Sequence, residues 1–400
     1  MRSTSALDPE VPSADACRRL RILHVSQPTD GGCASAVRSL AEAGTRAGHT
    51  VTVACPRQSD LAAWINDVGA RWHPLPMVRQ PAPGDIPALL RLRRLFERAD
   101  VVHLHSSKAG ALGRLALRSL GKRAPASCFT PHGWSWLVGG PMAPAYRTYE
   151  RVAAAWTDVI VAVSEEEAAA GRGVLRQGFT RMTVIPNGVD TERFCVEGSR
   201  ASRSAQPLVV CAGRLTVQKG QDLAIGALAR LKTTGARLRL VGEGPDTAKL
   251  RELAAALGVA DRVEFTGHRD PRPHLRAADV VLVPSRWEGL SFVLLEAMAC
   301  GKAIVTTAVG GSGVVGDAGV VVPLAVGSEG LAAALDELLA DEPTRRRLGE
   351  RARARVCEHF SADRMLTAYL DLWDALAEAT PGTGGGRDAR KTSRTTSRSR

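Results

Sequence analysis

Residues 283–305 read VPSRWEGLSFVLLEAMACGKAIV, and this stretch indicates the fold most directly. Within it, Glu288 and Glu296 stand in a mainly apolar run with seven residues between them. Burying a carboxylate is costly unless a partner compensates its charge. Either both glutamates face solvent or they hold a polar ligand.

The local pattern places the two carboxylates on different elements. Pro284 and Gly289 predict that an apolar strand over 278–285 ends in a loop, and that a helix then begins near Ser291. The loop carries the first glutamate and the helix carries the second. The helix start, which includes Leu290, has free N–H groups and a positive dipole that suit an anion. Carboxylates for hydroxyl groups on both sides of a phosphate site favour a nucleotide sugar as the ligand.

Short apolar runs alternate with helical patterns along both halves of the chain. In the first half we predict strands over 20–27, 49–55, 100–105 and 157–164, and helices over 34–48, 86–99 and 108–121. In the second half we predict strands over 208–215, 236–244, 262–267, 278–285 and 303–310, and helices over 220–235, 246–258 and 292–301. This order predicts an α/β chain of two doubly wound, Rossmann-like domains with parallel sheets. Ligands of such folds bind at the carboxyl ends of the strands, and here also in a cleft between the domains.

Shifts in composition predict where the domains begin and end. We expect a disordered lead over 1–19, a first domain over 20–195, a linker over 196–207, a second domain over 208–360, a C-terminal helix over 361–380 and a disordered basic tail over 381–400. The tail carries six Arg or Lys and one Asp, and so contributes +5 of the net charge of +12. Such a tail can bind anionic lipid or nucleic acid, although a solvated tail is the simpler interpretation.

The bulk composition limits the class of protein. No run reaches the ~18 apolar residues that a membrane-spanning helix needs, and the N-terminal stretch lacks the apolar core of a secretory signal. The eight cysteines are scattered without a Cys-x-x-Cys pair, which favours a reducing, cytoplasmic location. Aromatic residues make up only 4% of the chain and much of the charge lies in the tail, so we expect no specific nucleic-acid partner.

Two further loops of the second domain offer groups for a diphosphate. GRLTVQKG follows the first strand and contains Arg214 and Lys219, which suit phosphate oxygens, although two basic loop residues alone usually face solvent. GEGP ends another strand, and its Gly242, Glu243 and Gly244 would let the backbone approach a ligand closely. A lone Gly-x-Gly is a weak signal.

The first domain offers candidates at three strand ends. Gly31 and Gly32 in TDGGCAS would bring backbone N–H groups to a ligand, with a simple tight turn as the alternative. His132 in TPHGWSW follows a strand-like stretch, although a lone histidine is more often structural. In HLHSSKAG, the candidates for binding an acceptor are His105, Ser106 and Lys108.

Motifs of several other enzyme classes are absent or incomplete. GSGVVG matches a dinucleotide pattern, but a strand is predicted after it, where that fingerprint needs a helix. The chain has no Asp-x-Asp, no His-x-x-x-His, no paired Cys ligands and no Gly-x-Ser-x-Gly elbow. We therefore expect neither a metal ion nor an organic cofactor.

Taken in this order, the motifs over residues 20–380 resemble those of the retaining glycosyltransferases of family 4. EGLSFVLLE is similar to the Glu-x7-Glu motif of that family, and AGRLTVQKG, LVGEGP, VIPNGVDTERF and the first double glycine stand in matching positions. HSSKAGALGRLA and TPHG resemble a branch of bacterial enzymes that extend lipid-linked saccharides for exopolysaccharides and envelope glycans. The resemblance implies a GT-B fold in which the final helix crosses back to the first domain.

The resemblance also implies roles for the candidate residues. Arg214 and Lys219 would bind the donor diphosphate, Glu296 the ribose hydroxyls and Glu288 the hydroxyls of the transferred sugar. His132 would reach the sugar near its reacting carbon. In matching positions, the helix start at Gly289, Leu290 and Ser291 would face the phosphates.

The opposite domain and the base complete the implied donor site. Gly31 and Gly32 would approach the diphosphate and the sugar, and His268 and Arg269 would lie where the base packs. The implied reaction moves a sugar from a UDP- or GDP-sugar to a hydroxyl of a lipid-linked saccharide, with retention and without metal. The acceptor would attack on the face that the diphosphate leaves. Epimerases, phosphorylases and transferases of natural products remain alternatives on the same fold.

The stretch LLRLRRLFER, at 89–98, suggests contact with a membrane. Its four arginines surround a stripe of Leu and Phe, which suits an anionic bilayer surface. The alternative is a helix that packs on the sheet with its arginines in solvent. The first interpretation predicts a cytoplasmic protein that is peripheral on the inner face of the plasma membrane.

Overall fold

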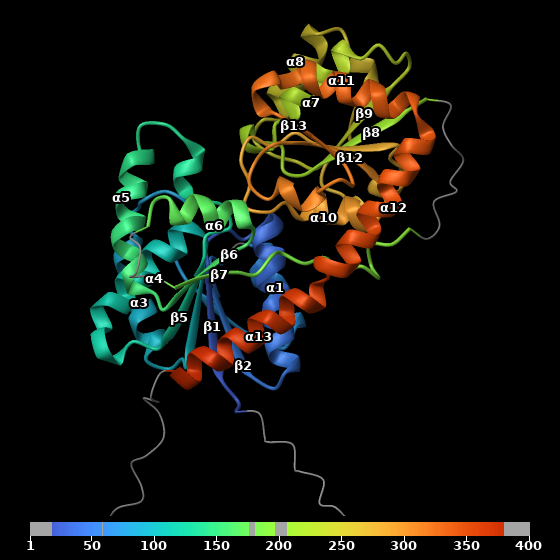
Figure 1. Cartoon of the computed structure of the whole chain (residues 1–400). Helices are drawn as coiled ribbons and strands as arrows, with labels where there is room; N and C mark the ends of the chain where they lie inside the picture. Colours follow the sequence, from blue (N-terminus) through green and yellow to red (C-terminus); the bar gives the residue numbers. More distant parts are fainter. Residues whose placement is uncertain (1–17, 58, 176–180, 197–205, 380–400) are drawn as a thin grey trace, which may run out of the picture.

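The computed structural model describes residues 18–57, 59–175, 181–196 and 206–379. They form two parallel sheets with flanking helices, and each sheet is built from one half of the chain (Figure 1). We call these halves the first and the second domain. The predicted tail, almost all of the predicted lead and most of the predicted linker lie outside the described residues.

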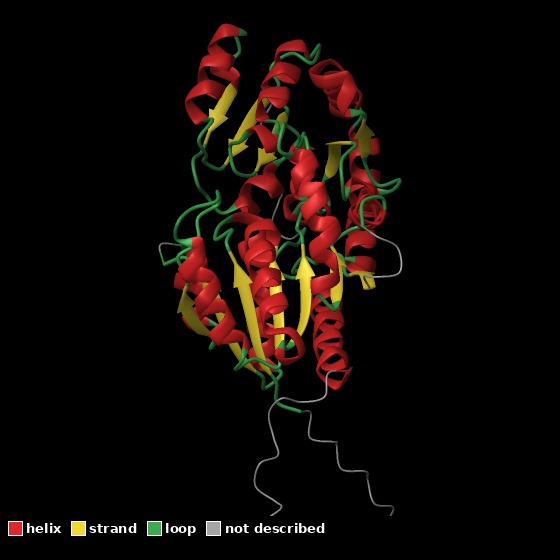
Figure 2. Cartoon of the chain, turned by 90° about the vertical axis from the view of Figure 1, so that its left-hand side faces the viewer, coloured by secondary structure: helices red, strands yellow, loops and turns green. Residues whose placement is uncertain are grey.

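The first sheet has seven parallel strands in the order β3-β2-β1-β4-β5-β6-β7. Its strands are β1 Arg21–Ser26, β2 Thr50–Cys55, β3 Arg71–Pro74, β4 Val101–His105, β5 Ala126–Thr130, β6 Val159–Ala162 and β7 Arg181–Val184. Its helices are α1 Gly31–Arg46, α2 Asp60–Asp67, α3 Asp85–Phe96, α4 Ser106–Leu120, α5 Ala143–Ala153 and α6 Glu165–Arg172. The strands β4, β5 and β6 are buried along their whole length, because helices cover both faces of the sheet (Figure 2).

The second sheet has six parallel strands in the order β10-β9-β8-β11-β12-β13. Its strands are β8 Leu208–Ala212, β9 Arg237–Val241, β10 Val263–Phe265, β11 Val280–Val283, β12 Ala303–Thr307 and β13 Val320–Val322. Its helices are α7 Gln221–Arg230, α8 Thr247–Ala256, α9 Pro271–Ala277, α10 Phe292–Ala299, α11 Gly327–Ala340 and α12 Glu342–His359. A loop over 284–291 follows β11, and α10 then begins at Phe292, which confirms the predicted helix start near Ser291.

The last described helix, α13 at Ala362–Ala379, returns from the second domain to the first (Figure 1). Its Met365, Tyr369, Trp373 and Leu376 stand three or four residues apart and are buried in one cluster with residues of the first sheet. Burying an apolar side chain of this size contributes roughly 1.5–3 kcal/mol. The helix therefore fastens the end of the chain to the first domain.

Each predicted strand and helix has a counterpart, usually with shorter ends, but several elements were missed. The missed strands β3 and β7 lie at the two edges of the first sheet and are only partly buried, so they lack the apolar runs of central strands. Among the missed helices are α2, α5, α6 and α9, and α6, for example, is short and begins with three glutamates. Among the described helices, none is long and apolar enough to cross a membrane.

Candidate active site

The predicted donor-binding residues lie where the carboxyl edges of the two sheets meet. Arg214 follows β8, Glu288 follows β11, and Gly31 and Gly32 follow β1 as the start of α1. Parallel strands bring their carboxyl ends to one edge, so loops that are far apart in sequence become neighbours. The interface between the domains therefore brings together the groups that could bind a ligand.

Glu288 is the centre of a hydrogen-bonded ion pair in the second domain. Lys219 Nζ lies 2.5 Å from Glu288 Oε1, and Ser285 Oγ donates to the same oxygen at 2.8 Å. The two charged side chains are largely buried, with 23% of the lysine and 10% of the glutamate exposed. In the described part of the chain no bond reaches Oε2, which leaves this atom to accept a hydrogen bond from a ligand hydroxyl.

The segment after β8 fixes the loop that carries Glu288. Gln218 Nε2 donates to the carbonyl oxygen of Trp287 at 3.1 Å. Gly220 has a φ of +66°, and a Cβ at this position would lie 2.0 Å from the carbonyl oxygen of Pro284. Only glycine fits this approach, so the two loops keep a fixed register.

Arg214 connects the second domain to the first. Its Nη1 lies 3.1 Å from the carboxylate of Asp30, the residue before α1, and both side chains are about half exposed. Nearby, a Cβ on Gly32 would lie 2.8 Å from the ring of Phe292, the first residue of α10. The start of α1 therefore faces the start of α10, and both helix starts favour negative charge.

Glu243, in the loop after β9, holds the loop after β10. Its Oε1 accepts a hydrogen bond from the backbone N–H of His268 at 3.1 Å. A Cβ on Gly244 would lie 2.1 Å from the carbonyl oxygen of Leu215, so this loop also packs on the loop that carries the basic residues. His268 and Arg269 are exposed at the edge of this group.

Glu296 lies inside α10, one turn beyond the helix start. Burial raises the pKa of this carboxyl to about 7, and the positive charges of Arg193 and Lys219 oppose part of the shift. The negative charge of Asp270 adds to it. A carboxyl group with this pKa accepts hydrogen bonds from hydroxyls in its ionised form and donates one when it is protonated.

Three histidines form a hydrogen-bonded chain in the first domain. His132 Nε2 lies 3.2 Å from His105 Nδ1, and His105 Nε2 lies 3.0 Å from His24 Nδ1. Each ring shares one proton position with the next, so the tautomer of one ring sets that of its neighbour. The buried end of the chain therefore controls which nitrogen of His132 carries the proton.

These imidazoles are neutral at physiological pH. Burial lowers the pKa of His132 to about 4 and that of His24 to about 3. The pKa of His105 lies well below its usual range, first through burial and then through repulsion from the neighbouring rings. A neutral ring can donate from one nitrogen and accept at the other.

His24, His103 and His105 also bring one ring nitrogen each within 4.8 Å, which is a possible set of metal ligands. Imidazole suits zinc and copper. The rings are fully buried, however, and no carboxylate belongs to the set, so a divalent charge there would be poorly compensated. His103 Nε2 instead lies 2.8 Å from Thr130 Oγ1, in keeping with a polar core held by hydrogen bonds.

One residue of this chain and one residue beside it have strained backbones. Ser106 and His132 have φ values of +64° and +53°, and among the described residues they alone are non-glycine residues with positive φ. They follow β4 and β5, which are neighbouring strands. A left-handed conformation costs roughly 1–2 kcal/mol for such residues, and such strain concentrates at functional sites.

The loop before α10, in the second domain, packs on the first domain through its backbone carbonyl groups. Ser164 Oγ donates to the carbonyl oxygen of Gly289 at 2.9 Å, and Asn187 Nδ2 donates to the carbonyl oxygen of Leu290 at 2.9 Å. The side chains of Ser164 and Asn187 are both buried. The helix start of α10 is therefore positioned by both domains.

A buried carboxyl group supports the same contact. Glu167 accepts hydrogen bonds from the backbone N–H groups of Gly133 at 2.5 Å and Val163 at 2.7 Å. Burial raises its pKa to about 7, although both hydrogen bonds favour the ionised form. Gly133 follows His132, so this carboxyl group fixes the backbone beside the histidine chain.

Lys108, predicted to bind an acceptor, pairs within the first domain. Its Nζ donates to Asp85 Oδ2 at 2.5 Å and to the carbonyl oxygen of Gln80 at 2.9 Å, and 10% of the side chain is exposed. The lysine therefore holds the loop before α3 against the start of α4.

Several residues of this interface were missed from the sequence. They are Asp30, Ser164, Glu167, Asn187 and His24. Two carried a recognisable signal, because Ser164 and Glu167 form the Ser-x-x-Glu pattern of a helix start and the serine indeed accepts from the N–H of Glu167. His24 carried no signal, since only the pairing of β1 with β4 places it beside His103.

Two Rossmann-like domains of this kind, with their carboxyl edges in contact, define the GT-B class of glycosyltransferases. The chain covers all of a solved sucrose-phosphate synthase from Thermosynechococcus elongatus, with 90% of its own length, 25% identity and a TM-score of 0.78. It also covers all of Alr3699/HepE from Anabaena, solved in complex with UDP-glucose, with 89% of its own length, 20% identity and a TM-score of 0.76. The second likeness supports the fold.

The sequence comparisons define the family. Residues 30–193 match the model described as Glycosyltransferase Family 4, and residues 206–341 match the model described as Glycosyl transferases group 1. The chain is 34% identical over 294 residues to a GDP-mannose-dependent alpha-(1-6)-phosphatidylinositol monomannoside mannosyltransferase from Mycobacterium tuberculosis, covering 67% of the chain and 74% of that relative. It is 29% identical to the putative glycosyltransferase EpsD of Bacillus subtilis, covering 76% of the chain and 84% of that relative. This chain belongs to glycosyltransferase family 4, as its motifs predicted, and it is a glycosyltransferase that uses nucleotide-sugar donors.

Proposed function

We propose that this protein transfers a sugar from a UDP- or GDP-sugar to a hydroxyl group of a lipid-linked saccharide, with retention of configuration and without a divalent cation. The observation that carries the proposal is the group of Arg214, Lys219 and Glu288 at the start of α10, opposite the double glycine of the first domain. Phosphates would bind the two cations and the helix start, and sugar hydroxyls would bind the glutamate.

The ion pairs of the structure suggest how the donor enters. Arg214 pairs with Asp30, and Lys219 pairs with Glu288. A diphosphate carries more charge than either carboxylate and would replace them as partner of the cations. Glu288 would then turn its carboxylate to the sugar hydroxyls. Positive charge already in place when the phosphate leaves lowers the barrier of the chemical step.

The proposed reaction needs no protein nucleophile. The acceptor hydroxyl attacks the anomeric carbon on the face from which the diphosphate departs, and the departing phosphate oxygen takes the hydroxyl proton. His132 holds the sugar near the reacting carbon through a neutral ring whose orientation is fixed by His105. Contact between the domains excludes water and aligns the two substrates.

The lipid-linked acceptor is supported by the name of one relative. The Mycobacterium tuberculosis relative is named for a phosphatidylinositol monomannoside acceptor.

Helix α3 supports a peripheral contact with an anionic membrane on the cytoplasmic side. It buries Leu92 and Phe96 but exposes Leu90, Arg91 and Arg94. Sedimentation with vesicles that contain 30% phosphatidylserine at low salt tests this contact, and a protein that stays in the supernatant would contradict it.

A thermal-shift panel tests the donor proposal. UDP-, GDP-, ADP- and dTDP-sugars are compared, with NAD as a control, with and without a chelator. A ligand at 100 times its Kd stabilises the native state by about 2.7 kcal/mol, which shifts the melting temperature measurably. We expect one nucleotide class to shift it, without any effect of the chelator. Loss of the shift with the chelator would contradict a metal-independent donor site.

Epimerases and phosphorylases on the same fold are the second candidate. Release of free nucleotide distinguishes them, because a transferase releases it in step with glycosylation of a hydroxyl acceptor. The anomeric proton of the product, read by NMR, then distinguishes retention from inversion. An inverted product would disprove the mechanism above while leaving the donor site intact.

A further inference from the structure

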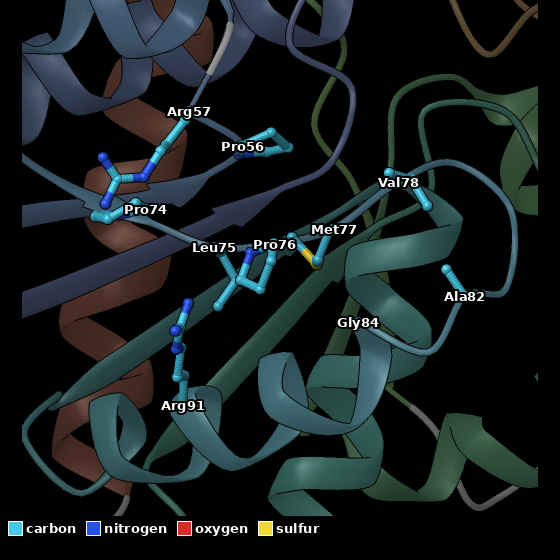
Figure 3. A pocket seen from close by; sticks show the side chains of 10 residues that line it. All are labelled: Pro56, Arg57, Pro74, Leu75, Pro76, Met77, Val78, Ala82, Gly84 and Arg91. Carbon is cyan, nitrogen blue, oxygen red and sulfur yellow. The ribbon is translucent and has the colours of Figure 1, made fainter.

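A pocket of about 410 Å³ opens at the carboxyl ends of β2 and β3, and none of the residues that line it belongs to the proposed donor site (Figure 3). We call it the β2–β3 pocket. Its volume falls in the range of small-molecule sites. Its apolar wall consists of Pro74, Leu75, Pro76, Met77, Val78 and Ala82. Val78 is 55% exposed, so part of this wall is open to solvent.

Two arginines supply the charge of the β2–β3 pocket. Arg57 follows β2 and Arg91 lies on α3, and both side chains are drawn on the same side of the pocket in Figure 3. The ten lining residues include no acid. Asp85, which begins α3, is already paired with Lys108. An apolar wall beside two guanidinium groups suits an apolar chain that carries a phosphate.

Lys108 connects this pocket to the histidine chain. Its bonds to Gln80 and Asp85 hold the loop that contains Ala82, and Lys108 itself stands three residues after His105. The strand order β2-β1-β4-β5 puts three spacings between β2 and β5, the strand that leads to His132. With strands about 4.8 Å apart, the separation is about 14 Å. A ligand anchored in the pocket must extend over this distance to react.

We propose that the β2–β3 pocket anchors the acceptor by an apolar chain joined to a phosphate, while the reacting hydroxyl group lies about 14 Å away beside His132. Arg57 and Arg91 hold the phosphate, and the prolines and Met77 cover the first carbons of the chain. This inference rests on the proposed function and deepens it, because it assigns the anchoring site of the acceptor. A single sugar without such an anchor would bind weakly.

Calorimetric titration of the whole chain tests the anchor directly. With UDP and GDP in excess to occupy the donor phosphates, octyl phosphate below its micelle concentration is compared with inorganic phosphate and with octyl glucoside. We expect octyl phosphate to bind at least 10-fold more tightly than either. Equal binding of octyl phosphate and inorganic phosphate would overturn the apolar part of the proposal, and equal binding of octyl glucoside would overturn the charged part.

Two pairs of variants distinguish binding in the pocket from attraction to the basic charge of the surface around it. Arg57→Ala with Arg91→Ala should weaken octyl phosphate at least 10-fold. Arg94→Ala on α3 with Arg98→Ala just after it removes the same charge outside the pocket lining and should not weaken it. Ala82→Phe fills the pocket and should reduce octyl phosphate to the affinity of inorganic phosphate, with Ala82→Ser as the control. Equal losses in both arginine pairs would overturn the site.

The anchor and the donor proposal fail in different ways. If no nucleotide sugar shifts the melting temperature but octyl phosphate still binds through Arg57 and Arg91, the proposed function is wrong and the pocket stands. If a nucleotide sugar binds and turns over but octyl phosphate does not distinguish the variants, the anchor is wrong and the donor site stands. Steady-state turnover gives a third measurement, since the Arg57 and Arg91 variant should lose turnover on lipid-linked acceptors without losing donor affinity.

Discussion

The proposed donor side of the interface, in the second domain, and the proposed acceptor side, in the first, pair their polar groups in different ways. In the second domain, Lys219 and Arg214 pair with carboxylates and remain partly exposed. In the first domain, His24 and His105 are neutral and fully buried. The half-exposed pair of Arg214 with Asp30 exchanges partners at little cost, whereas a buried neutral chain keeps one geometry. The donor side is therefore suited to receive charge and the acceptor side to hold a position.

The largest expected effect comes from removing the donor cations. Arg214→Ala or Lys219→Ala should lower turnover at least 100-fold, because a charged contact to phosphate contributes a few kcal/mol in the transition state. Steady-state kinetics with the donor identified by thermal shift provide the measurement. Arg237→Ala is the control, since this exposed arginine begins β9 at the opposite edge of the sheet. Unchanged turnover in both cation variants would sink the donor assignment.

Substitutions of the two glutamates of the Glu-x7-Glu motif should differ in which ligand they weaken. Glu288→Gln should weaken a nucleotide sugar about 10-fold or more and leave the free nucleoside diphosphate almost unchanged, since the carboxylate serves sugar hydroxyls. Glu296→Gln should weaken both about equally, because ribose is present in both. Calorimetry with the two ligands measures this. The reverse pattern would exchange the two roles.

How much of this could be predicted differs between the two sides. The proposed donor residues could be nominated from the sequence, because Arg214 with Lys219, and Glu288 with Glu296, lie in two short stretches where local spacing reports spatial proximity. The histidine chain could not be predicted, because His24, His105 and His132 come from three different strands or the loops after them and meet only through strand pairing. The same holds for the β2–β3 pocket, whose two arginines stand 34 residues apart in sequence. Sheet topology, rather than local spacing, decides which of these groups meet.

We expect the histidine chain to contribute to turnover by holding His132 in position. His105→Phe keeps the ring volume but breaks the bond to His132, so we expect kcat to fall about 10-fold with little change in donor KM. His103→Phe is the matched control on the same strand, because His103 bonds to Thr130 instead. His105→Gln, which can bridge the same neighbours, should restore part of the rate. If both phenylalanine variants lose kcat equally, the role of His105 is structural.

The smallest effect is a difference in how stability depends on pH, and it has opposite signs on the two sides. His24 has a folded pKa of about 3 against an ordinary value of 6.5, so between these values the unfolded chain binds the extra proton and stability rises with pH. Glu296 has a folded pKa of about 7 against 4.5, so between these values the folded chain holds the extra proton and stability falls as pH rises.

His24→Phe should therefore flatten the loss of melting temperature from pH 6 to pH 4.5. Glu296→Gln should flatten the loss from pH 5 to pH 7. Each group contributes at most about 1.4 kcal/mol per pH unit, and less where solvent reaches it, as at the partly exposed Glu296. Thermal melts of the two variants beside the parent protein measure both slopes, and a parallel shift at all pH values would show that neither group titrates as its burial implies.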